Sequence, residues 1–218
     1  MRSALVAIAV LLLAAGCGGA KGSSNAAGDS GSAPATCETV DTPLAREPAI
    51  LRPPRHPLNP SKKYTLTFDT SCGTFTVRLD PKLAPHTTAS LVALTKKKYF
   101  DDTIVLRIVP RLLIQAGDPT QTGAGQPGYS TVDVPPKGTH YTRGIVAMAK
   151  SQLDQPGTAG SQFFVVTAKR FALPPIYAVV GRISHGLGVV ERIGKLGNEK
   201  QLPRRPILIK TVTLDVSP

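Results

Sequence analysis

The chain has 218 residues, a formal net charge of +12 and an apolar fraction of 41%. This length fits one domain with additional segments, and the apolar fraction is sufficient for a hydrophobic core. Aromatic residues make up only 5%, and twenty glycines and twenty prolines favour turns and short strands over long helices. The basic residues are scattered rather than gathered on one helix, which favours solvated surface charge over a nucleic-acid partner. The compartment inferred from the N-terminal residues suggests an anionic envelope surface as the alternative partner.

Residues 1–16 have the pattern of a signal peptide. Arg2 precedes an apolar run from Ala4 to Ala15, which is too short to remain in a bilayer as a spanning helix. The run ends in LAAGC, which resembles a bacterial lipobox, where the peptide is cut before a lipid-modified cysteine. We therefore expect lipidation of Cys17, export, and anchoring to the outer-facing side of a bacterial cell membrane. An ordinary secretory signal with an incidental cysteine is the alternative.

Residues 17–60 are predicted to form a flexible, lipidated tether. Residues 18–34 are rich in Gly, Ser and Ala and hold almost no large apolar side chain, so they cannot form a core. Residues 42–60 are rich in proline, which indicates an extended, irregular segment that lies over the domain or links to it.

Cys37 and Cys72 are the two cysteines that remain if Cys17 carries lipid. An even number of cysteines in an exported chain favours a disulfide between them. Such a bond would stabilise the fold by roughly 3–4 kcal/mol if chain entropy dominates. Two free thiols are the alternative.

Residues 61–218 are predicted to form the folded domain. Apolar residues alternate in two segments that a short turn separates, which is typical of a hairpin. Helical spacing follows at residues 86–98 and again at 186–195. The expected strands are 64–68, 73–79, 104–109, 112–116, 145–149, 163–167, 178–183 and 207–215. No βαβ rhythm is present, so we expect a mainly β fold, a closed eight-stranded antiparallel barrel with a helix at each end.

Two stretches are expected to meet at a site. Residues 105–118 are an apolar run that contains a single cation, Arg107, and a charge in such a run is costly unless it lines a site. Residues 160–166 contain Phe163 and Phe164 in tandem, which should face opposite sides of a strand, with Phe163 toward the core. The loop at 119–141 is too long to be idle and should lie near this site. Together they predict an apolar pocket with one guanidinium and one or two amides.

Three separated segments, 99–118, 144–149 (GIVAMA) and 160–168, resemble the cyclophilins in order and spacing. Cyclophilins are peptidyl-prolyl cis-trans isomerases built on an eight-stranded barrel, and the resemblance covers residues 64–215. It implies a monomeric isomerase without cofactor or metal, whose partners are proline-containing peptides and unfolded exported proteins. A non-catalytic module that binds proline segments on the same fold is the alternative.

Rotation about an X–Pro bond has a barrier of about 18–20 kcal/mol because resonance keeps the bond planar. A donor to the prolyl nitrogen weakens this resonance, and arginine is a permanent donor whose effect rises where water is excluded. The resemblance implies that Arg107 and Gln115 are catalytic. The substrate-binding residues that it implies are Leu112, Leu113, Ala149, Lys150, Gln162, Phe164, Leu173 and Tyr177.

Several positions depart from the family pattern. Leu112 stands where an aromatic residue is usual, Ala172 where a tryptophan is frequent, and Tyr177 where a histidine is frequent. The Ala172 departure predicts weak cyclosporin binding, and the Leu112 departure predicts reduced turnover. An ion pair of Arg107 with Asp118 or Asp102 is the structural alternative for the arginine, and Asp118 could instead orient the adjacent loop.

Overall fold

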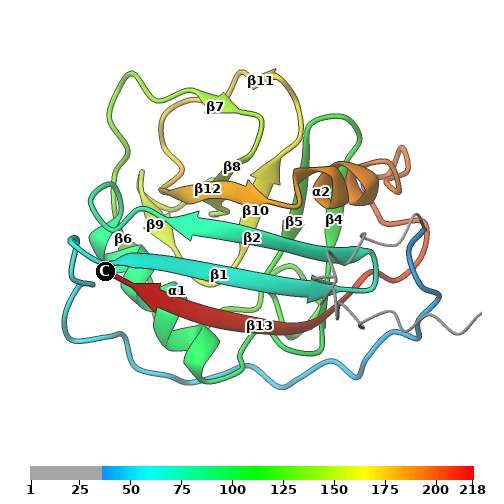
Figure 1. Cartoon of the computed structure of the whole chain (residues 1–218), viewed down its shortest axis with the longest axis horizontal. Coiled ribbons are helices and arrows are strands. Elements are labelled where there is room, and N and C mark those ends of the chain that lie inside the picture. The colour runs from blue at the N-terminus through cyan, green and yellow to red at the C-terminus, as the bar shows by residue number, and fades with distance from the viewer. Residues whose placement is uncertain (1–35) are drawn as a thin grey trace, which may run out of the picture. The chain divides into compact units, whose positions relative to one another are not determined.

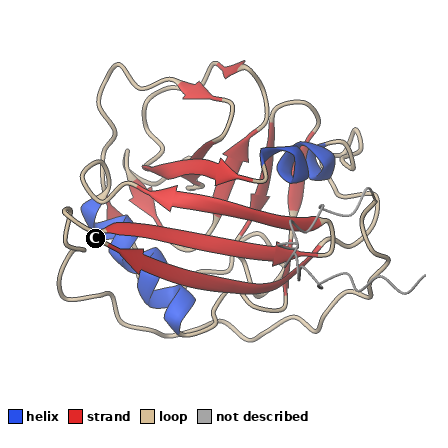
Figure 2. Ribbon diagram, viewed as in Figure 1, coloured by secondary structure: helices blue, strands red, loops and turns tan. Residues whose placement is uncertain are grey.

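A computed structural model describes residues 36–218, which are mainly β with two helices (Figures 1 and 2). The helices are α1 (Pro85–Lys96) and α2 (Leu187–Gly194). The strands are β1 (Lys63–Thr70), β2 (Gly73–Leu79), β3 (Thr103–Ile104), β4 (Arg107–Val109), β5 (Leu113–Ala116), β6 (Thr131–Val132), β7 (Tyr141–Thr142), β8 (Ile145–Met148), β9 (Thr158–Ala159), β10 (Phe163–Val166), β11 (Arg170–Phe171), β12 (Val179–His185) and β13 (Leu208–Ser217).

Nine of these strands form one curled antiparallel sheet in the order β3-β13-β1-β2-β12-β8-β10-β5-β4 (Figure 1). The predicted hairpin is present as β1 and β2, with Thr70 opposite Gly73 at its turn. Side chains alternate between buried and partly exposed along β1, because successive residues of a strand point to opposite faces. Two short pairs, β11-β7 and β6-β9, lie outside this sheet.

The two edge strands of the sheet, β3 and β4, are consecutive in the chain. Only Val105 and Leu106 separate them; Val105 N donates to Ile207 O at 3.0 Å, whereas Leu106 N donates to Gln115 O at 3.0 Å. The strand predicted at 104–109 therefore divides its pairing between two neighbours. The sheet has nine strands where eight were expected, and closure of the barrel stays a prediction.

The helices lie at opposite ends of the sheet in Figure 1, α1 against β13 and β6, and α2 against β2 and β5. Helix α1 begins with Pro85, whose missing N–H costs nothing in the first turn. Its predicted end at Lys98 is two residues too late, because Lys98 has a left-handed backbone (φ 54°). Helix α2 buries Val189, Val190 and Ile193 on one face.

The core has two parts on the two faces of β10. Phe163 belongs to the main core, where its ring lies 5.3 Å from that of Phe68, which stacks on Phe75 at 4.8 Å. Phe164 belongs to a second cluster with Leu113 and Tyr141. The prediction that the tandem phenylalanines face opposite sides is confirmed. The second cluster is the one that reaches the candidate site.

Residues 36–60 contain no helix or strand, and they pack against the domain. Leu51 and Leu58 pack on the main core, and Arg46 N donates to Pro119 O at 2.9 Å. The flexible tether predicted over 17–60 therefore does not extend through this segment, and the compact unit begins before the expected boundary at residue 61. Prolines keep the segment extended, and contacts with the domain fix its path.

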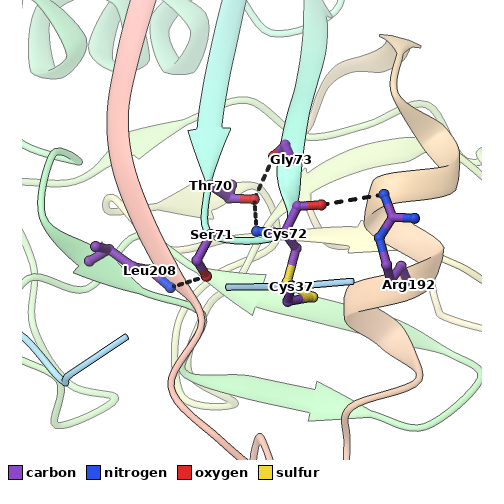
Figure 3. Close-up of a disulfide and its surroundings, with 7 residues drawn as sticks. All are labelled: Cys37, Thr70, Ser71, Cys72, Gly73, Arg192 and Leu208. Carbon is purple, nitrogen blue, oxygen red and sulfur yellow. Dashed lines mark hydrogen bonds between the residues drawn. A yellow bond between two sulfur atoms is a disulfide. The ribbon is translucent and has the colours of Figure 1, made fainter. Parts of the chain in front are cut away.

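Cys37 and Cys72 form a disulfide, which ties residues 36–60 to the turn between β1 and β2 (Figure 3). The turn is itself well bonded, since Thr70 Oγ1 accepts from Cys72 N at 3.1 Å. Arg192 of α2 donates to Cys72 O at 3.3 Å. The disulfide therefore joins the N-terminal segment to the sheet, and the hydrogen bond of Arg192 joins the same turn to α2.

The predicted signal peptide (1–16) and Cys17 lie outside the described residues. Within residues 36–218, no helix combines the length and the apolar character needed to cross a bilayer.

Candidate functional site

The candidate site is a groove of about 880 Å³ beside β4, β5 and β10. Eight of the ten residues predicted for the site line it: Arg107, Leu113, Gln115, Ala149, Lys150, Phe164, Leu173 and Tyr177. Residues that are far apart in the sequence therefore meet at one surface.

Strand register explains how the central three residues meet. Arg107 on β4 lies opposite Gln115 on β5, and Gln115 lies opposite Phe164 on β10. Directly opposed residues of antiparallel strands project to the same face, with Cβ atoms about 5 Å apart. The arginine, the amide and the aromatic ring thus form a row across three strands.

Arg107 is exposed, so the expectation that its guanidinium lies where water is excluded is wrong. Its Nε donates to Gln201 Oε1 at 2.8 Å, Nη2 donates to the same oxygen, and Nη1 donates to Gln115 Oε1 at 3.4 Å. Neither of the two ion pairs in residues 36–218 involves Arg107. The alternative of a structural pair with Asp118 or Asp102 is therefore wrong, and the cation is held by amides.

A chain of hydrogen-bonded amide side chains extends from Gln115 into a second pocket of about 350 Å³. Gln115 Nε2 donates to Gln162 Oε1 at 2.9 Å, and Gln162 Nε2 donates to the carbonyls of Gly123 (2.9 Å) and Gly125 (3.2 Å). Gln162 lines this second pocket rather than the groove, and Gln115, Ala149 and Lys150 line both. The predicted pair of amides is thus adjacent and joined.

Apolar and aromatic side chains form the floor of the groove. Phe164 and Leu113 are buried, and the ring of Tyr177 meets the ring of Phe164 edge-on at 5.6 Å. Beneath them, the Tyr141 hydroxyl donates to Tyr177 O at 2.9 Å and accepts from Tyr177 N at 3.1 Å. Burial raises the pKa of Tyr141, so its hydroxyl remains a neutral donor well into the alkaline range.

Leu112 does not line the groove, contrary to the prediction. It lies in the turn between β4 and β5, next to Arg111, whose φ is 63°. Its carbonyl accepts from Thr167 N at 2.9 Å, and Leu113 is the residue that reaches the floor. Resemblance alone cannot locate a turn side chain, because one left-handed residue redirects those that follow it.

Sequence reasoning did not name several residues that line the groove. Two of them, Val109 and Phe171, belong to β4 and β11, and the others lie in loops: Leu106, Gln121, Thr122, Gly123, Gln152, Lys200, Gln201 and Leu202. Gln121 and Gln201 have left-handed backbones, with φ of 59° and 62°. Such conformations are uncommon outside glycine and tend to occur at functional sites. The sequence signals were the stretch 105–118, which contains Leu106 and Val109, and the long loop at 119–141, which supplies part of this wall as expected.

Asp118 organises that loop. Its carboxylate is buried and accepts from the backbone N–H groups of Thr120 (2.8 Å), Gly123 (2.7 Å) and Gly125 (3.1 Å). Of its two predicted roles, orientation of the loop is the one that the structure shows. Across residues 36–218, no three His, Cys, Asp or Glu side chains gather where they could hold a metal ion.

A curled antiparallel sheet, an arginine beside two amides and an apolar floor together define a proline-binding isomerase of the cyclophilin class. The family model for cyclophilin type peptidyl-prolyl cis-trans isomerases matches residues 65–214. This chain belongs to that family and is a peptidyl-prolyl cis-trans isomerase.

Known proteins support this assignment. The chain is 34% identical over 159 residues to peptidyl-prolyl cis-trans isomerase-like 3 of Dictyostelium discoideum, covering 71% of this chain and 97% of that one. It is 37% identical over 142 residues to peptidyl-prolyl cis-trans isomerase-like 1 of Emericella nidulans, covering 62% and 85%.

Solved structures agree with the fold. A cyclophilin type peptidyl-prolyl cis-trans isomerase from Cryptosporidium parvum matches with a TM-score of 0.65 at 26% identity, covering 72% of this chain and 99% of that one. A crystal structure of the same protein in the presence of the dipeptide Ala-Pro matches with a TM-score of 0.64.

Proposed function

We propose that this isomerase is exported, anchored by a lipid on Cys17, and accelerates the folding of exported proteins at a bacterial cell envelope. The sequence pattern of residues 1–17 supports export and lipidation. The Cys37–Cys72 disulfide supports an oxidising compartment, since such bonds are rare in the cytosol. Slow proline isomerisation limits folding, so exported chains are suitable clients.

The observation that carries the catalytic assignment is the row of Arg107, Gln115 and Phe164 across three strands. A substrate proline would rest on Phe164 and Leu113, while the Gln115 amide donates to its carbonyl. Arg107 would then donate to the prolyl nitrogen as that atom becomes pyramidal, which weakens amide resonance. A crystal structure of the similar Cryptosporidium parvum protein was determined in the presence of the dipeptide Ala-Pro, which supports a proline-containing substrate.

The residue before proline would be held by main-chain pairing with residues 149–150, which accepts most sequences. Lys150 suits this role, because its ammonium is already occupied by the carbonyls of Ser151 (2.7 Å) and Asp154 (2.8 Å). Since Arg107 is exposed, a bound peptide would itself exclude water from the guanidinium. Its donor strength therefore rises only in the complex.

The test is an isomerase assay on a proline tetrapeptide with residues 37–218. We expect Arg107→Ala to lower kcat/KM by roughly 100-fold or more, as for other groups that stabilise a transition state. Arg111→Ala is the matched control, because Arg111 is an exposed arginine of the same hairpin that does not line the groove. Equal rates for the Arg107 variant and the parent would reject the assignment, and binding without acceleration would indicate the non-catalytic module.

Anchoring is tested with the full chain in a bacterial host. We expect the parent to take up labelled fatty acid and to sediment with membranes, whereas Cys17→Ala stays unlabelled. Labelling of both proteins, or of neither, would contradict the lipid anchor.

A further inference from the structure

Residues 37–58, termed here the strap, lie outside the family match at 65–214 but contact the loop that forms one side of the groove. This loop, residues 118–128, is termed the site loop. It supplies Gln121, Thr122 and Gly123 to the groove and Gln126 to the adjoining pocket.

Three hydrogen bonds join the strap to the site loop along its length. Arg46 N donates to Pro119 O at 2.9 Å, Gln121 Nε2 donates to Pro43 O at 2.8 Å, and Leu51 N donates to Pro127 O at 2.8 Å. The backbones also approach closely at Gly128, where an added Cβ would lie 2.9 Å from Ala49 O. The strap thus follows the loop from its beginning to its end.

The strap is held to the domain independently of the site loop. Its start is held by the Cys37–Cys72 disulfide and by Glu38, whose N–H donates to Ser71 O at 2.6 Å. In its middle, the Arg46 guanidinium donates to the carbonyls of Tyr99 (2.7 Å) and Asp101 (2.6 Å), just after α1. These attachments allow the strap to restrain the loop rather than move with it.

The site loop is in turn bonded to the groups that face the substrate. The Gly123 carbonyl accepts from Gln162 Nε2, Gln162 Oε1 accepts from Gln115 Nε2, and Gln115 Oε1 accepts from Arg107 Nη1. A loop displaced by an ångström would leave Gln162 without its acceptors and free both amides to rotate. A misplacement of this size in a catalytic site can cost a large part of its rate.

We propose that the strap is a positioning element of this isomerase, and that Arg46 is its principal positioning residue. It holds the site loop so that the Gln162 and Gln115 amides are oriented before the peptide binds. The effect on catalysis rests on the proposed role of Arg107 and Gln115. The restraint of the site loop by the strap does not depend on that role.

The test compares residues 37–218 carrying Arg46→Ala with Arg55→Ala, an exposed arginine of the same segment whose side chain makes no hydrogen bond within the described residues. We expect Arg46→Ala to lower kcat/KM roughly three- to tenfold at a temperature where both proteins are fully folded. A double variant, Cys37→Ser with Cys72→Ser, removes the disulfide that holds the start of the strap, and it should also lower kcat/KM.

Amide hydrogen exchange separates positioning from general destabilisation. In Arg46→Ala we expect faster exchange at residues 119–128, with exchange in β1, β2 and β13 unchanged. Unchanged kcat/KM together with unchanged loop exchange in both variants would overturn the proposal. If the parent lacks isomerase activity, the proposed function fails, whereas the exchange measurement still decides whether the strap restrains the loop.

Discussion

The groove has two sides of different construction. The strand side carries Arg107, Gln115 and Phe164 on β4, β5 and β10, where backbone pairing that also builds the core sets their positions. The loop side, residues 121–123 and 200–202, has neither helix nor strand. Side-chain and strap contacts hold residues 121–123, whereas Gln201 is bonded to β4 through Ile108 N, which donates to Gln201 O at 2.9 Å. A site of this kind keeps its reacting row in a rigid frame and leaves its opposite side open to adjustment.

The largest expected effect comes from the strand side. Phe164→Ala should lower the free energy of unfolding by about 3–5 kcal/mol, and so should Phe163→Ala, because both rings are buried. The milder substitution Phe164→Leu should lower kcat/KM about tenfold, because the proline of the substrate loses the flat ring on which it packs. Phe163→Leu is the matched control and should keep the parent's kcat/KM, since Phe163 faces the other side of β10. If Phe163→Leu lowered kcat/KM as much as Phe164→Leu, the effect of Phe164 would come from packing of the core and not from contact with the substrate. Denaturant unfolding and the tetrapeptide assay measure the two quantities.

A smaller effect is expected on the loop side. Asp118→Ala should lower the free energy of unfolding by roughly 2–4 kcal/mol, because the backbone N–H groups of Thr120, Gly123 and Gly125 lose a charged acceptor. It should also lower kcat/KM, since the site loop loses its internal support. Asp215→Ala, an exposed carboxylate on β13, should leave both quantities near those of the parent. Retention of full activity in folded Asp118→Ala would show that the strap alone can hold the loop.

The smallest effect concerns the layer beneath the floor. Burial raises the folded-state pKa of Tyr141 above the value of about 10 in an unfolded chain. The neutral hydroxyl is favoured by folding, so its contribution is fully present below pH 10 and is lost as pH rises toward the folded pKa. Tyr141→Phe should cost about 1 kcal/mol near neutral pH, because Tyr177 loses two hydrogen bonds. Between pH 8 and pH 11, the free energy of unfolding should decrease less steeply with pH in this variant than in the parent.

The two sides also differ in how far they could be predicted. Alternation of apolar residues predicted β1, β2 and the opposite orientations of Phe163 and Phe164, because side chains of a strand have a period of two. Gln201 had no sequence signal at all, yet it makes two of the three hydrogen bonds of Arg107. Loop residues with left-handed backbones reach the groove through turns that neither spacing nor residue type specifies.

The sequence by itself determined the fold class, the two helices and the residues of the strand side, since these follow from local periodicity and from motifs whose register is set by backbone pairing. Only the tertiary structure decided that Arg107 is open to solvent, that Leu112 does not line the groove, and that residues 36–60 pack on the domain and contact the site loop. These features depend on contacts between segments that are distant in the chain, and a linear pattern does not contain the path of a turn or the partner of a proline-rich segment.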